Sequence, residues 1–135
     1  MNKLPSIITQ ITAAESILLV DVEVDGHPMS ALLTESPFSG EWLKQGNKVT
    51  VVFKETEVSL MKNFAGTISL RNQLPCRVTA VEKGAILGVV HLLFRNIHLT
   101  SAITTRSIEG MDIRPGDEVT AMIKANEVSL VKAHP

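Results

Sequence analysis

Apolar and polar residues alternate along several short segments of the chain, as they do in strands that bury one face. The pattern covers Ile7 to Ile11 and then Leu18 to Val24, and Asp25-Gly26 follows with the residue types of a tight hairpin turn. A return strand is expected from Met29 to Thr34. Valine, isoleucine and threonine together make up 36 of the 135 residues, the β-branched excess that is typical of strands. The pattern therefore predicts a β protein.

The alternating pattern occurs twice. Displacing the sequence by 70 positions aligns residues 2–62 with residues 72–132 without a gap, and 16 of the 61 aligned positions are identical. The identities include the run Glu57-Val58-Ser59-Leu60, which recurs as Glu127-Val128-Ser129-Leu130. A match of this length indicates a tandem duplication. We place the first unit at residues 1–63 and the second at residues 64–135.

Each unit is expected to contain one short helix and two further strands. The alternation stops between Glu35 and Leu43 and again between Thr105 and Ile113, where a helical turn and a tight turn fit best. The last two strands of each unit are expected at residues 49–54 and 58–61, and again at 119–124 and 128–131. Five short strands and one small helix in about 60 residues suit an OB-like Greek-key barrel. The predicted fold class is therefore all-β, with two tandem barrels.

Composition argues against several classes of protein. Thirteen Lys and Arg residues against 14 Asp and Glu residues give a formal net charge of −1, so binding to nucleic acid through bulk charge is not expected. Four Phe, one Trp and no Tyr provide few stacking platforms for single strands. No apolar run is long enough to cross a membrane, and no signal-peptide pattern opens the chain. The lone Cys76 fits a reducing, cytoplasmic setting.

The sequence contains no recognisable catalytic motif. It lacks the Gly-x-Ser-x-Gly, His-Glu-x-x-His and phosphate-loop patterns, so the chain is not expected to be an enzyme. Among its histidines (His27, His91, His98 and His134), His91 and His98 stand seven residues apart across a predicted hairpin. They are too scattered to indicate a metal cluster without further ligands, and no metal site is expected. Cys76 is expected to be a packed residue rather than a nucleophile.

Hydroxyl and cationic residues stand at positions of the second unit that apolar periodicity does not explain. They are Ser69 and Arg71 before the first strand, with Leu70 between them, Thr104 and Ser107 at the helical turn, and Lys124, followed by Ala125, after the fourth strand. Such side chains, with the free amides of a helix start, donate hydrogen bonds, whereas a fully ionised tetrahedral oxyanion only accepts them. The alternative is a solvated barrel rim, with Ser69 and Ser107 as caps and Arg71 and Lys124 in water.

These segments resemble the Mop unit of the molbindins, a TOBE-like unit that binds molybdate. Ser69-Leu70-Arg71-Asn72 stands where that family has Ser-Ala-Arg-Asn, and Leu74-Pro75 stands at its Leu-Pro-Gly start. Ile103 to Ser107 matches its Ile-Thr-x-x-Ser turn, and Lys124-Ala125 matches its closing Lys-Ala. The resemblance implies cytoplasmic binding of molybdate or tungstate for storage or homeostasis, without an organic cofactor. It further implies that the oxyanion lies between units, held by the Ser, Arg and hydroxyl donors of one and the Lys segment of another.

The two units depart from the family pattern to different degrees. In the second unit Leu70 replaces Ala, and Cys76 stands where the family often has Gly, as Ser6 does in the first. The first unit begins Met1-Asn2 and so lacks the Ser and the Arg, and Pro37 takes the place that Ser107 has in the second. The second unit is thus expected to carry the complete oxyanion motif. The first keeps a possible secondary set of donors at Thr34, Ser36 and Lys54.

The resemblance also implies a homo-oligomer. Three tandem chains would form a ring of six units with oxyanion sites at the seams, whereas a dimer would correspond to the molybdate-responsive repressors. The trimer is favoured because the sequence supplies no second dimerising domain. The competing interpretation is a regulatory or nucleic-acid-binding OB-like module without an oxyanion ligand. The sequence leaves open whether molybdate or tungstate is preferred, and whether the role is storage or sensing.

Overall fold

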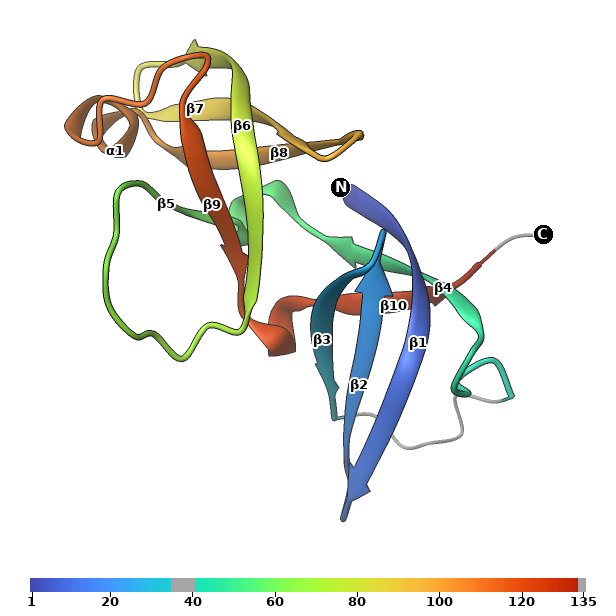
Figure 1. Ribbon diagram of the computed structural model, residues 1–135. Helices are drawn as coiled ribbons and strands as arrows, with labels where there is room; N and C mark the ends of the chain where they lie inside the picture. Colours follow the sequence, from blue (N-terminus) through green and yellow to red (C-terminus); the bar gives the residue numbers. More distant parts are fainter. Residues whose placement is uncertain (35–40, 134–135) are drawn as a thin grey trace.

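The computed structural model describes residues 1–34 and 41–133 and consists mainly of β-strands, arranged as two five-stranded sheets (Figure 1). The first unit contains β1 (Asn2–Ala14), β2 (Ile17–Val24), β3 (His27–Leu33), β4 (Lys48–Phe53), the 3-10 helix η2 (Glu55–Glu57) and β5 (Ser59–Met61). The second contains β6 (Asn72–Lys83), β7 (Leu87–Phe94), β8 (Ile97–Thr104), α1 (Thr105–Gly110), β9 (Glu118–Ile123), η3 (Ala125–Glu127) and β10 (Ser129–Lys132). The predicted all-β class with two tandem OB-like bodies is confirmed.

The two units exchange their last strands. One sheet has the order β10-β4-β1-β2-β3 and the other has the order β5-β9-β6-β7-β8. β5 of the first unit pairs antiparallel with β9, and β10 of the second unit pairs antiparallel with β4. Figure 1 shows β10 leaving the upper body and crossing the lower one beside β4. The boundary predicted between residues 63 and 64 is a division of the sequence repeats, while each folded body contains strands from both units.

Alternation along the strands fills each body with apolar side chains. β1 buries Leu4 and Ile8 and exposes most of the residues between them, and Phe53 of β4 and Phe94 of β7 are among the largest fully buried side chains. Burying one such side chain contributes about 1.5–3 kcal/mol to folding. The polar residues Asn2 and Ser6 occupy inward positions of the same strand. These polar residues interrupt the apolar pattern, so the pattern predicted a strand only from residue 7. In the structure the strand already begins at residue 2.

Equivalent asparagines join the two bodies. The side chain of Asn72 donates to the backbone oxygen of Ser30 at 2.8 Å and accepts from the Ser30 N–H at 2.7 Å. Asn2 makes the same pair of bonds with the backbone of Thr100, both at 2.9 Å. Both asparagine side chains are buried. Each asparagine therefore satisfies one backbone N–H and one C=O on the third strand of the opposite unit, which holds the bodies together across a pseudo-twofold arrangement.

The exchanged strand β5 is followed by a lysine that ties it to the second body. Lys62 Nζ lies 2.9 Å from Asp117 Oδ2 and donates to the backbone oxygens of Met111 and Asp112 at 3.2 and 2.7 Å. The pKa of Asp117 is lowered, first by its hydrogen bond from Lys62 and then by the backbone N–H of Arg114. The contact fixes β5 against the loop that precedes β9.

The helix predicted in the second unit is present as α1. Thr104 is its N-cap, and its Oγ1 accepts a hydrogen bond from the Ser107 N–H at 3.1 Å. The corresponding helix expected in the first unit falls largely on residues 35–40, which lie outside the described residues, and residues 41–46 form turns.

Candidate oxyanion-binding site

The structure brings one half of the predicted donor set together. Ser69, Leu70 and Arg71 lead directly into β6, and Lys124 and Ala125 directly follow β9. Asn72, the first residue of β6, lies opposite Ile123, the last residue of β9. The two segments therefore meet at one end of this strand pair. The side chains of Ser69, Arg71 and Lys124 are exposed there, while Leu70 and Ala125 are half-buried.

Thr104 and Ser107 are adjacent to each other at the start of α1. Thr104 Oγ1 lies 2.9 Å from Ser107 Oγ, and both side chains are exposed. Thr104, rather than Ser107, is the capping residue. Thr104 Oγ1 accepts from the Ser107 N–H and donates its own proton to Ser107 Oγ, so the Ser107 hydroxyl is the donor that this pair can offer to an incoming acceptor.

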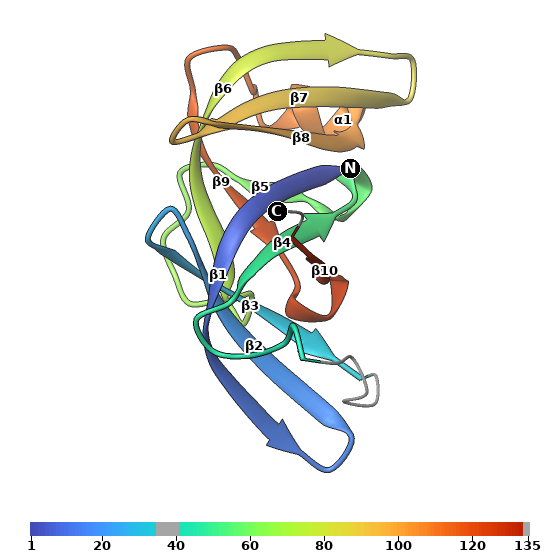
Figure 2. The same cartoon turned by 90° about the vertical axis from the view of Figure 1, so that its right-hand side faces the viewer.

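The two halves of the donor set lie at opposite ends of the second body. Thr104 pairs with Leu87 at the start of β7, and the start of β7 lies opposite the last residues of β6. Arg71, by contrast, precedes the first residue of β6. β6 has 12 residues, which corresponds to roughly 40 Å along the strand. Figures 1 and 2 both show α1 far from the start of β6. A single chain therefore does not bring Thr104 and Ser107 next to Arg71 and Lys124.

The donors of the first unit stand in a different setting. Thr34 is exposed and directly follows β3, and Lys54 is exposed and precedes η2. The backbone N–H of Lys54 donates to Glu57 Oε1 at 2.9 Å, and Glu55 pairs with the amino terminus of the chain. Two carboxylates, Glu55 and Glu57, therefore follow Lys54 within three residues, whereas only Glu127 follows Lys124 within the same distance. Ser36 lies outside the described residues.

A depression of about 320 Å³ beside Arg71 is not suited to an anion. Asp21 and Glu23 line it together with Arg71 and Asn72. Asp21 Oδ1 accepts from Ser30 Oγ at 2.6 Å. Because two carboxylates face this space, a dianion placed in it would be repelled.

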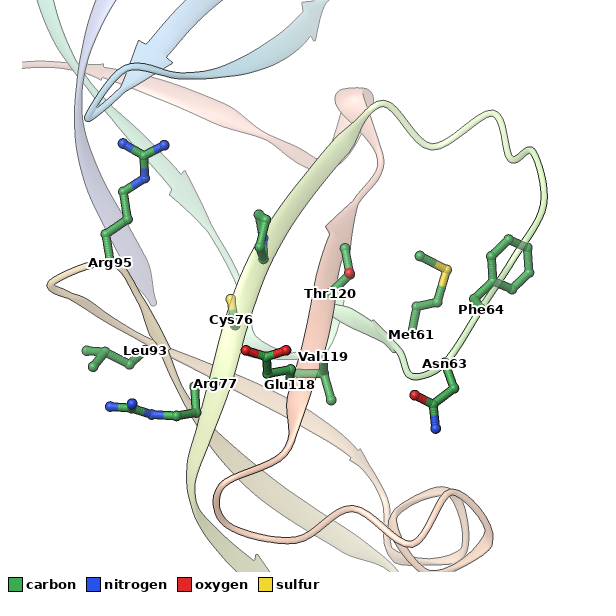
Figure 3. Close-up of a pocket in the computed structure, with 11 residues that line it drawn as sticks. Met61, Asn63, Phe64, Cys76, Arg77, Leu93, Arg95, Glu118, Val119 and Thr120 are labelled. Carbon is green, nitrogen blue, oxygen red and sulfur yellow. The ribbon is translucent and has the colours of Figure 1, made fainter.

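A groove of about 550 Å³, which we call groove two, runs over the outer face of β5, β9 and β6. Figure 3 shows Arg77 and Arg95 toward one end of it and Met61 and Phe64 toward the other. Glu118 lies directly across the strands from Arg77. Cys76 also borders the groove, and burial raises its thiol pKa to about 12. The thiol is therefore protonated at neutral pH and unsuited to nucleophilic chemistry.

The first unit has an equivalent groove of about 400 Å³, which we call groove one. Eight of its nine lining residues occupy positions 70 residues before lining residues of groove two, and the ninth, Ala133, corresponds to Asn63. The charges are inverted at two of these positions, because Lys48 corresponds to Glu118 and Asp25 to Arg95. Arg95 and Asp25 also pair with each other inside the chain, with Nη1 and Oδ2 3.5 Å apart.

No group of three or more His, Cys, Asp or Glu side chains is placed to hold a metal ion among the described residues. His91 and His98 are nevertheless close to each other, with His91 Nδ1 and His98 Nε2 3.3 Å apart. No helix in the described part of the chain is both long and apolar enough to span a membrane.

Comparison with known proteins assigns the family. The family model of the TOBE domain matches residues 1–60 and again residues 68–130. The chain belongs to the TOBE domain family. The two matches correspond to the two sequence units. The chain therefore consists of two TOBE domains in tandem, and we call it the TOBE tandem.

Named relatives of this TOBE tandem are molybdenum-related proteins. The molybdenum import ATP-binding protein ModC of Brucella abortus is 36% identical over 87 residues, which cover 64% of this chain and 24% of ModC. The molybdenum transport protein ModE of Herbaspirillum seropedicae is 28% identical over 130 residues, which cover 94% of this chain and 48% of ModE. The chain thus spans between a quarter and a half of the length of these two relatives.

A solved structure matches the TOBE tandem over nearly its whole length. It is the cytoplasmic molybdate-binding protein ModG in a molybdate-bound form, with a TM-score of 0.92 and 26% sequence identity. The match covers 98% of this chain and 96% of ModG. The similarity therefore includes both bodies and their relative placement.

Proposed function

We propose that this TOBE tandem binds molybdate and tungstate in the cytoplasm as a storage or homeostasis protein and has no enzymatic activity. The observation that carries the proposal is the convergence of Ser69, Leu70 and Arg71 with Lys124 and Ala125 at the adjoining ends of β6 and β9. The overall similarity to the cytoplasmic molybdate-binding protein ModG supports it.

The chemistry of these donors fits a tetrahedral dianion. All four oxygens of molybdate or tungstate accept hydrogen bonds, while Arg71 and Lys124 only donate and Ser69 can donate. Two cations also compensate the charge of the anion when water is removed from it, and charge-assisted hydrogen bonds are about twice as strong as neutral ones. No organic cofactor is needed for such a site.

The distance between the two donor groups supports a site shared by chains. Thr104 and Ser107 lie at the far end of the second body from Arg71 and Lys124. A site that uses all four residues therefore needs Thr104 and Ser107 from one chain and Arg71 and Lys124 from another. Contacts between opposite ends of a molecule form a ring when the rotation from one chain to the next closes, and an open filament when it does not. We favour a trimer, which would place six TOBE units around one axis, with a dimer as the alternative. Thr34, Ser36 and Lys54 of the first unit would form at most a weaker, secondary site.

Calorimetric titration with four oxyanions tests the proposal. Molybdate and tungstate are expected to bind at least tenfold more tightly than phosphate. Phosphate is partly protonated at neutral pH, and its hydroxyl group would be a hydrogen-bond donor facing the donors of the site. Sulfate should bind more weakly because it is smaller. Native mass spectrometry of the same samples gives the number of anions per assembly.

Two outcomes would contradict the proposal in different ways. Equal affinity for phosphate and molybdate would mean that the donors recognise anions without the selectivity proposed here. Absence of binding by all four oxyanions would favour a regulatory or nucleic-acid-binding module without an oxyanion ligand, and a fluorescence titration with labelled oligonucleotides would then separate those two possibilities.

A further inference from the structure

A cluster of three side chains lies on the second sheet away from the donor set. Glu82 of β6, His91 of β7 and His98 of β8 form a diagonal row across neighbouring strands. His91 Nε2 lies 2.5 Å from Glu82 Oε2, and His91 Nδ1 lies 3.3 Å from His98 Nε2. The side chain of His91 is 27% exposed and that of Glu82 is 71% exposed, so solvent reaches the row.

The hydrogen bond to Glu82 orients the ring of His91 and selects the tautomer of its neutral form. An ionised carboxylate only accepts, so the proton between the two groups is donated by Nε2 of His91. The neutral ring then carries a free lone pair on Nδ1, which is the atom that faces His98. Histidine ligands of metal ions commonly donate their second ring nitrogen to a carboxylate in this manner.

The spacing of the two ring nitrogens matches the geometry of a tetrahedral metal site. Zinc binds histidine nitrogens at about 2.0–2.1 Å, and two such ligands at the tetrahedral angle lie about 3.3 Å apart. The separation of His91 Nδ1 and His98 Nε2 is 3.3 Å, which is long for a hydrogen bond. The ring centroids are 5.4 Å apart and the planes differ by 31°.

We propose that His91 and His98 bind a divalent late transition-metal ion such as Zn²⁺, with Glu82 as the positioning residue and water or another molecule in the remaining coordination positions. Imidazole ligands suit zinc, copper and nickel and disfavour magnesium and calcium. The first unit provides an internal comparison, because Thr12, Asp21 and Pro28 occupy the three equivalent positions. The site therefore belongs to the second unit alone and is independent of the oxyanion donors.

Calorimetric titration of the full chain with zinc chloride, in a buffer without chelators or oxyanions, tests this site. One zinc ion is expected per chain, and magnesium chloride should give no binding. His98→Ala should weaken zinc binding at least tenfold by removing a ligand. Glu82→Gln should weaken it about tenfold, because the loss of a carboxylate behind a ligating histidine typically costs 10–100-fold in metal affinity.

His27→Ala is the matched control, since it also removes one imidazole, which bonds to the backbone oxygen of Gln73 and not to the row, and it should leave zinc affinity unchanged. Thermal unfolding without metal shows whether each variant remains folded, and zinc should raise the melting temperature of the wild type but not of His98→Ala. Absence of zinc binding by the wild type, or equal affinity in the wild type and His98→Ala, would overturn the proposal. Neither result would affect the oxyanion site, which is assayed separately with molybdate.

Discussion

Arg71 and Ser69 precede the same strand, yet they differ in the strength of the hydrogen bonds that they offer an anion. A bond from a charged donor contributes about 1.5–3 kcal/mol and one from a neutral hydroxyl about 0.5–1.5 kcal/mol. Arg71→Ala should therefore weaken molybdate binding by about 10- to 150-fold and Ser69→Ala by about 2- to 10-fold. Lys124→Ala should resemble Arg71→Ala, while Lys54→Ala should cost less than Lys124→Ala, because the carboxylate of Glu55 directly follows Lys54 where Ala125 follows Lys124. Calorimetry on the four variants measures these differences.

A larger loss of molybdate affinity in Lys54→Ala than in Lys124→Ala would show that the first unit carries the principal site.

The types of donor residue could be predicted from the sequence, because donor types and their order along the chain are local properties. The partners of those residues were not accessible. Nothing in the sequence around Arg71 indicates that Asp21 and Glu23 of the other unit line the depression beside it, since that contact depends on how the two bodies pack.

Among the elements, the third strand of each unit depends on an asparagine of the other. Asn72→Ala would leave the N–H and C=O of Ser30 without their partners, and a buried backbone group that loses its hydrogen bond costs about 1–3 kcal/mol. The variant should lose about 2–4 kcal/mol of unfolding free energy in a urea titration. Asn96→Ala, at an exposed turn, is the control and should change stability by no more than about 0.5 kcal/mol. Equal stability of the two variants would show that the asparagine bonds do not hold the bodies together.

The elements also show which parts of the fold the sequence could predict. Strand positions and the turn at Asp25-Gly26 followed from local alternation and turn chemistry, and both residues have positive φ angles, 50° and 80°. The strand exchange was not predictable, because β5 and β10 have the same apolar pattern whichever sheet receives them. The identity of Asn2 and Asn72 was visible in the repeat, but buried asparagines joining two bodies can be distinguished from exposed ones only in three dimensions.

At the scale of the whole molecule, duplication has produced two equivalent grooves that differ in charge. Groove one contains Lys48 and groove two contains Glu118 at the same position, and both side chains are exposed. At this position, two copies of groove one facing each other would bring lysines together, and two copies of groove two would bring glutamates together. Over the whole linings, groove one also contains Glu23 and Asp25 and groove two also contains Arg77 and Arg95, so the two grooves have opposite net charge. Opposed charges across an interface select the partner, and like charges brought together cost several kcal/mol. The grooves therefore favour contacts in which groove one of one chain meets groove two of another.

This arrangement predicts how charge reversal affects assembly. Lys48→Glu and Glu118→Lys should each weaken association at least tenfold, because each creates a pair of like charges at the contact. The double variant should recover the wild-type mass, since it restores opposite charges with the grooves interchanged. Light scattering at micromolar concentration measures all four proteins, and the wild type is expected at the mass of three chains. A wild-type mass of one chain would contradict assembly altogether, and a mass of two chains would favour the dimer. If the double variant stayed as dissociated as the single ones, the two lysine and glutamate positions would not face each other, and the contact would have to involve surfaces other than the grooves.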